Sequence, residues 1–148
     1  LYIKLKIFSK NNFPEIFLEY NIINESKGVI YMIITDKKVD SFMNRFGGDG
    51  EVIIEHYLPE AMLNSTVNLY ARVILKPGCN LGYHAHIGNS ETIVVLSGEA
   101  EYNDNGKLVN LKAGDVVHCP DGESHSIGNA ASSKEDLYLQ ALIIKSNI

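Results

Sequence analysis

The chain has 148 residues, of which 45% are hydrophobic and 21% are charged, and this composition is typical of a single globular domain. A net charge of −5 without a basic cluster argues against nucleic acid as a partner. Two cysteines, Cys79 and Cys119, are too few for a disulfide framework. We therefore expect free thiols and a cytoplasmic location, with a disulfide between the two cysteines as the alternative.

Residues 1–66 are expected to form short strands, loops and helical turns that precede a barrel. The run from Leu1 to Phe8 is broken by Lys4 and Lys6, so it is too short and too charged for a signal peptide or a spanning helix. We interpret it as an N-terminal strand and expect no membrane contact. The other elements predicted in this part are a loop or helical turn at 9–20, a strand at 29–35, a short helix within 36–46, a strand at 51–58 and a helical turn at 59–64.

A glycine-rich stretch, Gly47-Gly48-Asp49-Gly50, separates two of these elements. Glycines at this density predict a flexible turn. Such a turn could gate the mouth of a barrel, and a plain surface connection is the alternative.

Residues 67–75 alternate in polarity, which is typical of a barrel strand. One face carries Val67, Leu69, Ala71, Val73 and Leu75. Tyr70 and Arg72 lie on the other face. If that face lines a lumen, Arg72 would suit a carboxylate substrate by bidentate pairing, and an exposed or salt-bridged arginine is the alternative.

Two histidines and a glutamate follow at spacings that suit a metal ion. His84 and His86 are separated by one residue, so on a strand they project to the same face while Ala85 points away. A hairpin at Ile87–Ser90 would return Glu91 to the side of both imidazoles. Two imidazoles and a carboxylate at one point form a ligand set for a divalent transition metal. A His-x-His pair alone is a weak signal, since a single strand histidine is usually a structural polar group.

Short β-rich runs separated by turn residues continue to the end of the chain. Asn105-Gly106 between two such runs is a strong hairpin signal. Strands are predicted at 99–103, 107–111, 116–119, 124–128 and 137–145. This pattern predicts an all-β barrel or sandwich, with its core in 67–145 and the whole chain, 1–148, as one domain.

A further histidine, His125, lies just past a turn at Pro120 and Gly122. It enters a short predicted strand and could supply a third nitrogen to the same centre.

Together these stretches resemble the two sequence motifs of the cupin superfamily. The first motif is filled by Gly78, His84, His86, Glu91 and Gly98. The second is filled by Gly114, Pro120, Gly122, His125 and Asn129. The resemblance implies a small single-domain metal-binding cupin: an all-β double-stranded β-helix, or jelly-roll barrel, with short N-terminal strand and helical-turn additions. It also implies one divalent transition metal per chain, held by His84, His86, Glu91 and His125.

A set of three imidazoles and one carboxylate does not select one metal, so Mn, Fe, Co, Ni, Cu and Zn all remain candidates. Four protein ligands leave one or two positions open on a five- or six-coordinate ion, where a small molecule could bind. A closed tetrahedral zinc site is the alternative. The metal centre is the catalytic candidate, with Glu91 as the residue that could act in it.

Five further residues are candidates for the substrate pocket: Tyr70, Arg72, Tyr102, His118 and Gln140. For His118 a barrel or surface role is the alternative. For Tyr102 and Gln140 the sequence does not show which barrel face is inside.

The functional prediction is a metal-dependent small-molecule enzyme, a dioxygenase or another oxidoreductase. The alternatives are a metal-containing module that binds or senses a small ligand, and a purely structural metal barrel. We also expect a homodimer, because the N-terminal strands could pair across a two-fold axis and cover an open sheet edge.

Overall fold

The computed structural model describes residues 8–10, 13–15, 29–30 and 33–146, and strands dominate this part of the chain. Near the N-terminus, two short antiparallel pairs are formed by β1 (Phe8–Lys10) with β2 (Phe13–Glu15) and by β3 (Val29–Ile30) with β4 (Ile33–Ile34). The predicted strand at 1–8 lies outside the described residues except for Phe8. The predicted strand at 29–35 is instead the pair β3 and β4.

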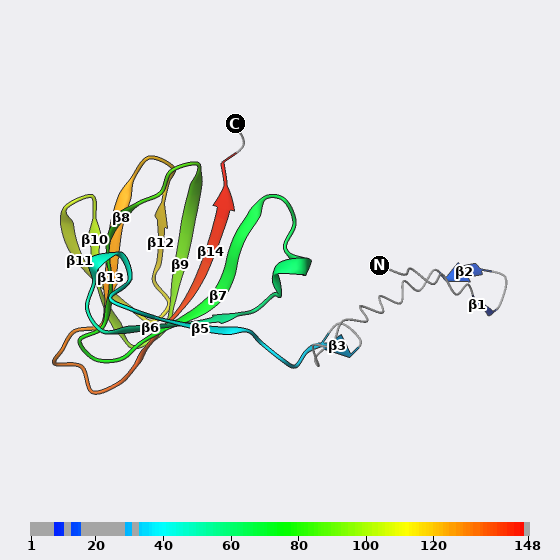
Figure 1. Cartoon of the computed structure of the whole chain (residues 1–148), viewed down its shortest axis with the longest axis horizontal. Coiled ribbons are helices and arrows are strands. Elements are labelled where there is room, and N and C mark those ends of the chain that lie inside the picture. Colours follow the sequence, from blue (N-terminus) through cyan, green and yellow to red (C-terminus); the bar gives the residue numbers. More distant parts are fainter. Residues whose placement is uncertain (1–7, 11–12, 16–28, 31–32, 147–148) are drawn as a thin grey trace.

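The body of the fold consists of two antiparallel sheets (Figure 1). The larger sheet has the order β12 (Val116–Cys119), β9 (Asn89–Ser97), β14 (Leu137–Lys145), β7 (Val67–Leu75), β6 (Glu51–His56) and β5 (Val39–Met43). The smaller sheet has the order β11 (Lys107–Lys112), β10 (Glu99–Asp104), β13 (Ser124–Gly128) and β8 (Asn80–Ala85). Two 3₁₀ turns, η1 (Arg45–Gly47) and η2 (Glu60–Met62), lie on either side of β6 in the sequence. This arrangement confirms the predicted all-β fold.

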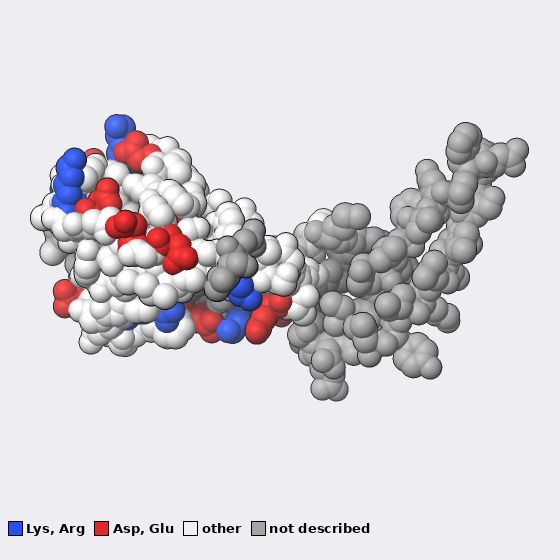
Figure 2. Space-filling model, turned by 90° about the horizontal axis from the view of Figure 1, so that it is seen from above, with Lys and Arg blue, Asp and Glu red and all other residues white. Residues whose placement is uncertain are grey.

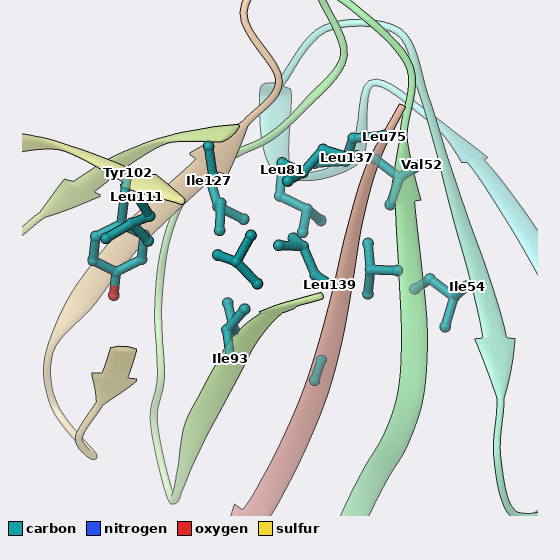
Figure 3. Packing of buried hydrophobic residues seen from close by; sticks show 14 of the residues in the cluster. Val52, Ile54, Leu75, Leu81, Ile93, Tyr102, Leu111, Ile127, Leu137 and Leu139 are labelled. Atoms are coloured by element: carbon teal, nitrogen blue, oxygen red, sulfur yellow. The ribbon is translucent and has the colours of Figure 1, made fainter. Parts of the chain in front are cut away.

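The core lies between the two sheets because alternate side chains of each strand point inward. In β7 the inward residues are Ala71, Val73 and Leu75, as predicted, and β14 places Ala141, Leu139 and Leu137 directly opposite them. Figure 3 shows how these side chains meet others from the smaller sheet within one cluster. Apolar contact across this gap therefore fixes which face of each strand is the inner one.

Turn chemistry gives the hairpin between β10 and β11 the predicted form. Asp104 pairs with Lys107, which leaves Asn105 and Gly106 as a two-residue loop. Both loop residues have positive φ, 47° and 93°, as a type I′ turn requires. The predicted helical turn at 59–64 is also confirmed, by η2.

The short helix predicted within residues 36–46 is wrong, because β5 occupies Val39–Met43. In the pairing with β6, Asp40 lies opposite Ile54 and Phe42 lies opposite Val52, so these side chains share the inner face. Pairing with the edge of an existing sheet outweighs the mixed local preferences of this segment.

The hairpin predicted between the histidine pair and Glu91 is also wrong. β8, which carries His84, lies beside β13 in the smaller sheet, whereas β9, which carries Glu91, lies between β12 and β14 in the larger sheet. Glu91 therefore approaches the imidazoles across the gap between the sheets and not from a neighbouring strand.

Lysine and arginine side chains are scattered beside aspartates and glutamates on the face shown in Figure 2. Both cysteines are free thiols, as expected. Over the described residues, we find no helix with the length and apolar character needed to cross a bilayer.

Shortening a leucine at the centre of this core should destabilise the fold. Leu139 is 1% exposed, so Leu139→Ala is expected to lower the free energy of unfolding by about 2–5 kcal/mol. Leu108 is 78% exposed, and Leu108→Ala, the matched control, should change it by no more than about 0.5 kcal/mol. Urea titration followed by circular dichroism measures both variants. Equal losses would contradict the position assigned to the core.

Candidate metal centre

Four side chains from both sheets meet at one end of the core. Nitrogen or oxygen atoms of His84, His86, Glu91 and His125 all lie within 4.8 Å of one another. His84 and His125 are register partners on β8 and β13, and His86 follows the end of β8. Glu91 reaches the same point from β9 in the opposite sheet. His86, Glu91 and His125 are buried, and His84 is half-buried.

The spacing of the donor atoms fits coordination to one ion. Nε2 of His86 lies 3.0 Å from Nε2 of His125. Oε2 of Glu91 lies 3.0 Å from Nε2 of His125 and 3.3 Å from Nε2 of His86. Two ligand atoms each about 2.1 Å from a metal and at right angles to one another would be about 3.0 Å apart. The residues present therefore fit a divalent transition metal.

The outer nitrogen of each imidazole has a hydrogen-bond partner, which leaves the other nitrogen facing the centre. Nδ1 of His84 donates to the carbonyl oxygen of Gly82 at 2.8 Å, and Nδ1 of His86 donates to Oδ1 of Asn89 at 2.6 Å. Because both partners are acceptors, the neutral form of each ring carries its proton on Nδ1 and has its lone pair on Nε2. A second proton on Nε2 of His86 or His125 is the one that would donate to Glu91. Nδ1 of His125 contacts the Tyr102 hydroxyl at 3.2 Å.

The electrostatics of the cluster keep the carboxylate charged. Burial raises the pKa of Glu91, but hydrogen bonds with His125 and His86 outweigh it and lower that pKa to about 2. Burial lowers the pKa of His84, whereas the hydrogen bond with Glu91 raises the pKa of His86. When a cation takes the place of the Nε2 protons, the same carboxylate and the freed imidazole lone pairs form a donor set that suits it.

The cluster opens on a cavity of about 370 Å³. His84, His86 and Glu91 form part of its wall, and Leu69, Ile54 and Ile143 supply apolar surface. On the side of β5 and β6, the wall holds Asp40 and His56, whose Oδ2 and Nε2 atoms are 2.9 Å apart. A small molecule in the cavity would therefore lie beside three of the four residues of the cluster.

Of the five residues predicted for the substrate pocket, Tyr102 is the one in contact with the cluster. It is buried, and its ring packs edge-on against that of His125 with centroids 5.6 Å apart. Figure 3 shows Tyr102 at the edge of the core cluster, near Leu111 and with its hydroxyl oxygen directed away from the other side chains. Tyr102 thus contacts His125 through Nδ1, on the side of the imidazole that faces away from the cluster.

None of the five candidates, Tyr102 included, lines this cavity, so the prediction that they form the substrate pocket is wrong for it. Arg72 forms an ion pair with Glu55, which is the salt-bridged alternative, and its guanidinium lies 5.7 Å from the Tyr138 ring. Gln140 is its register partner, so both lie on the outer face of the larger sheet. The remaining two also have outer-face partners, Tyr70 with the Tyr57 ring and His118 with the hydroxyl of Thr92.

Several residues of the site were not identified from the sequence. Asn89 orients His86, and its only sequence signal is its place in the turn before Glu91. Phe46 stacks on the His84 ring with centroids 4.1 Å apart and planes at 14°. Arg45 lines the cavity beside it. The glycine-rich stretch 47–50 marked this region as a turn near a barrel mouth but did not single out these two side chains.

Comparison with known proteins gives consistent results. The family model described as "Cupin domain" matches residues 71–139. A Thermotoga maritima protein named "Oxalate-binding protein" is 39% identical over 115 residues, covering 76% of this chain and 93% of that protein. A crystal structure from Thermotoga maritima, described as a predicted oxalate decarboxylase, has a TM-score of 0.70 and 39% identity, covering 76% of this chain and 96% of that one. The crystal structure of a cupin 2 conserved barrel domain protein of Salinispora arenicola has a TM-score of 0.53 and 25% identity, covering 62% of this chain and 74% of that one.

The low pKa of Glu91 predicts a loss of stability in acid. A carboxyl whose pKa is lower in the folded than in the unfolded chain stabilises the fold above its ordinary pKa of 4.5, and this contribution is lost as the pH falls toward about 2. With metal removed by a chelator, the free energy of unfolding of the parent should therefore fall more steeply over this window than that of Glu91→Gln. The difference should be on the order of 3 kcal/mol.

Urea titration at several pH values measures this difference. Glu101→Gln, at an exposed position on β10, is the control and should follow the parent. Parallel curves for the parent and Glu91→Gln would show that Glu91 is not stabilised as an anion.

Proposed function

The chain belongs to the cupin superfamily, with its double-stranded β-helix fold, and we propose that its cavity binds a small dicarboxylate of the oxalate class at a divalent metal. His84, His86, Glu91 and His125 would hold one ion per chain. When bound, such an ion supplies a Lewis-acidic centre that attracts and orients carboxylate oxygens.

The observation that carries this proposal is a cluster of four donor residues, three of which line a cavity. A structural metal site is normally closed, with all coordination positions filled by protein. Here His84, His86 and Glu91 line a cavity of about 370 Å³, which favours a site that receives a ligand over a purely structural one. A closed tetrahedral site would have no use for this space.

Two arguments support oxalate as the ligand class. The first is the relative named "Oxalate-binding protein", because the chain matches 93% of its length at 39% identity. The second is chemical. Oxalate offers one oxygen from each carboxylate to the same ion, so it needs two adjacent open positions, which four protein ligands leave on a six-coordinate metal.

Catalysis is the second candidate function, and the paired Asp40 and His56 favour it. Conversion of oxalate to formate and carbon dioxide breaks one carbon–carbon bond and consumes one proton. Hydrogen bonds from Lys38 and then His56 lower the pKa of Asp40, so Asp40 accepts in this pair as a carboxylate. The pair lies in the cavity wall and could deliver a proton there. The alternative catalysed reaction is the oxidoreductase or dioxygenase activity predicted from the sequence.

The remaining expectations stay predictions. β5 is an edge strand of the larger sheet, and pairing across it would suit the homodimer expected from the sequence. The cytoplasmic location, the absence of nucleic acid as a partner and the single-domain organisation rest on the sequence.

Removing one donor should empty the metal centre. We expect His86→Ala and His125→Ala to lose most of the metal that the parent retains, about one ion per chain, because three donors would remain from a buried set of four. Plasma mass spectrometry of desalted protein measures the content. His118→Ala is the matched control, since that imidazole is exposed and bonded to Thr92. Full metal content in both donor variants would rule out the proposed ligands.

Oxalate binding should depend on the metal. Calorimetric titration of the parent loaded with Mn(II) should give oxalate binding that disappears after the metal is stripped with a chelator and returns on reloading. Equal binding with and without metal would contradict the proposed function.

The same loaded protein separates binding from turnover. Release of formate or carbon dioxide, or uptake of oxygen, would establish catalysis, and His56→Gln should then slow it while leaving the metal content unchanged. Binding without product would assign the chain to the ligand-binding alternative.

A further inference from the structure

Among the described residues, Arg45 supplies the one arginine or lysine side chain that lines the cavity. It lies on the loop 44–50, which packs against the candidate metal centre. The loop follows β5 and is closed by two hydrogen bonds: Asn44 N donates to Gly50 O at 2.8 Å, and Gly50 N donates to Asn44 Oδ1 at 3.1 Å. A Cβ atom at Gly82 of β8 would come within 2.1 Å of the Phe46 carbonyl oxygen. The loop backbone therefore rests directly on the strand that carries His84.

Phe46 ties the position of this loop to the imidazoles. Its φ of 56° lies in the left-handed region, which is uncommon for a residue with a side chain. In this conformation its ring stacks on His84 at 4.1 Å. The side chain next to it in the sequence, Arg45, is thereby placed at the same wall of the cavity as the donor cluster.

The Arg45 guanidinium is held by aromatic rings and not by an acid. Its central carbon lies 4.1 Å from the Phe42 ring centroid and 4.8 Å from that of Phe46. Stacking engages the face of a guanidinium and leaves the N–H groups on its edge free to donate. Within the described part of the chain, no ion pair to Arg45 is formed.

The carboxylates that line the cavity are already engaged with other partners. Asp40 pairs with Lys38 and His56, and Glu91 pairs with the imidazoles of the cluster. A half-buried guanidinium with unused donors, in a cavity whose acids are engaged, is complementary to an anionic group on a ligand.

We propose that Arg45 sets the specificity of the site by receiving the outer oxygens of a dicarboxylate whose inner oxygens face the metal. This inference rests on the proposed function and adds the residue that distinguishes a dicarboxylate from other metal chelators. Oxalate bound through one oxygen of each carboxylate directs its two remaining oxygens away from the metal. The planar fork of an arginine can donate one N–H to each of them as a bidentate pair, which an ammonium group cannot do.

The test compares two chelators on metal-loaded protein. Oxalate has two outer carboxylate oxygens, whereas acetohydroxamate chelates a metal and has no carboxylate. In calorimetric titrations, Arg45→Gln should weaken oxalate binding by about 10- to 100-fold. Acetohydroxamate binding and metal content should match the parent. Arg45→Lys keeps the charge and should recover only part of the oxalate affinity.

Arg72→Gln is the matched control, since Arg72 is the other arginine of the chain and lies on the outer face, paired with Glu55. It should bind oxalate as the parent does. Parental oxalate affinity in Arg45→Gln would overturn the inference while leaving the proposed function intact. Equal losses for both chelators would overturn it as well, since Arg45 would then support the metal centre itself. Failure of the loaded parent to bind oxalate would overturn the proposed function and the inference together.

Discussion

The contact of Glu91 with His86 and His125 across the gap between two sheets is the constraint on which the site depends. These polar groups lie at one end of an otherwise apolar core, where an unpaired carboxylate or imidazole would be costly. Each imidazole is consequently held twice, by the cluster on one side and by Gly82, Asn89 or Tyr102 on the other. The geometry of the donors follows from the packing of the sheets, so an ion would meet a site formed in advance.

The same packing explains why the two sides of the cavity differ in character. On the side of the imidazoles, close backbone contact between the loop 44–50 and β8 leaves no room for a side chain at Gly82. Phe46 and Arg45 are directed toward the cavity by that contact. On the other side, β5 and β6 contribute Asp40 and His56 as a bonded pair. The proposed metal, anion and proton roles would thus fall to separate groups that line one cavity, which a purely structural site would not need.

Local patterns in the sequence were sufficient to predict much of the fold. The alternation in 67–75 predicted both the strand and its inner face, and Asn105-Gly106 predicted a hairpin because the required backbone conformation is encoded in the two residues themselves. The parity of His84 and His86 placed them on one face. Glu91 was expected beside them, but through a hairpin that the structure does not form, and the resemblance to two short motifs implied the full set with His125.

Features that depend on distant contacts were not predictable in this way. Nothing near Glu91 shows that β9 joins a different sheet from β8, because strand partners are chosen by the whole core. For the same reason Tyr70, Arg72 and Gln140 could not be assigned to the outer face in advance. Arg45 and Phe46 carry no motif, and their role depends on a loop whose resting place is another strand.

The position of the donors in opposite sheets has a consequence for how the chain can vary. Strand side chains alternate between faces, so one residue inserted between His86 and Glu91 would turn the carboxylate from the core to the outer surface unless the extra residue were absorbed in the turn. The hairpin at Asn105 and Gly106 carries no such constraint, since it lies between two neighbouring strands of one sheet. A length change at that hairpin therefore leaves the donors in place, whereas a change within the segment 87–90 preserves them only where the turn absorbs it before β9 begins.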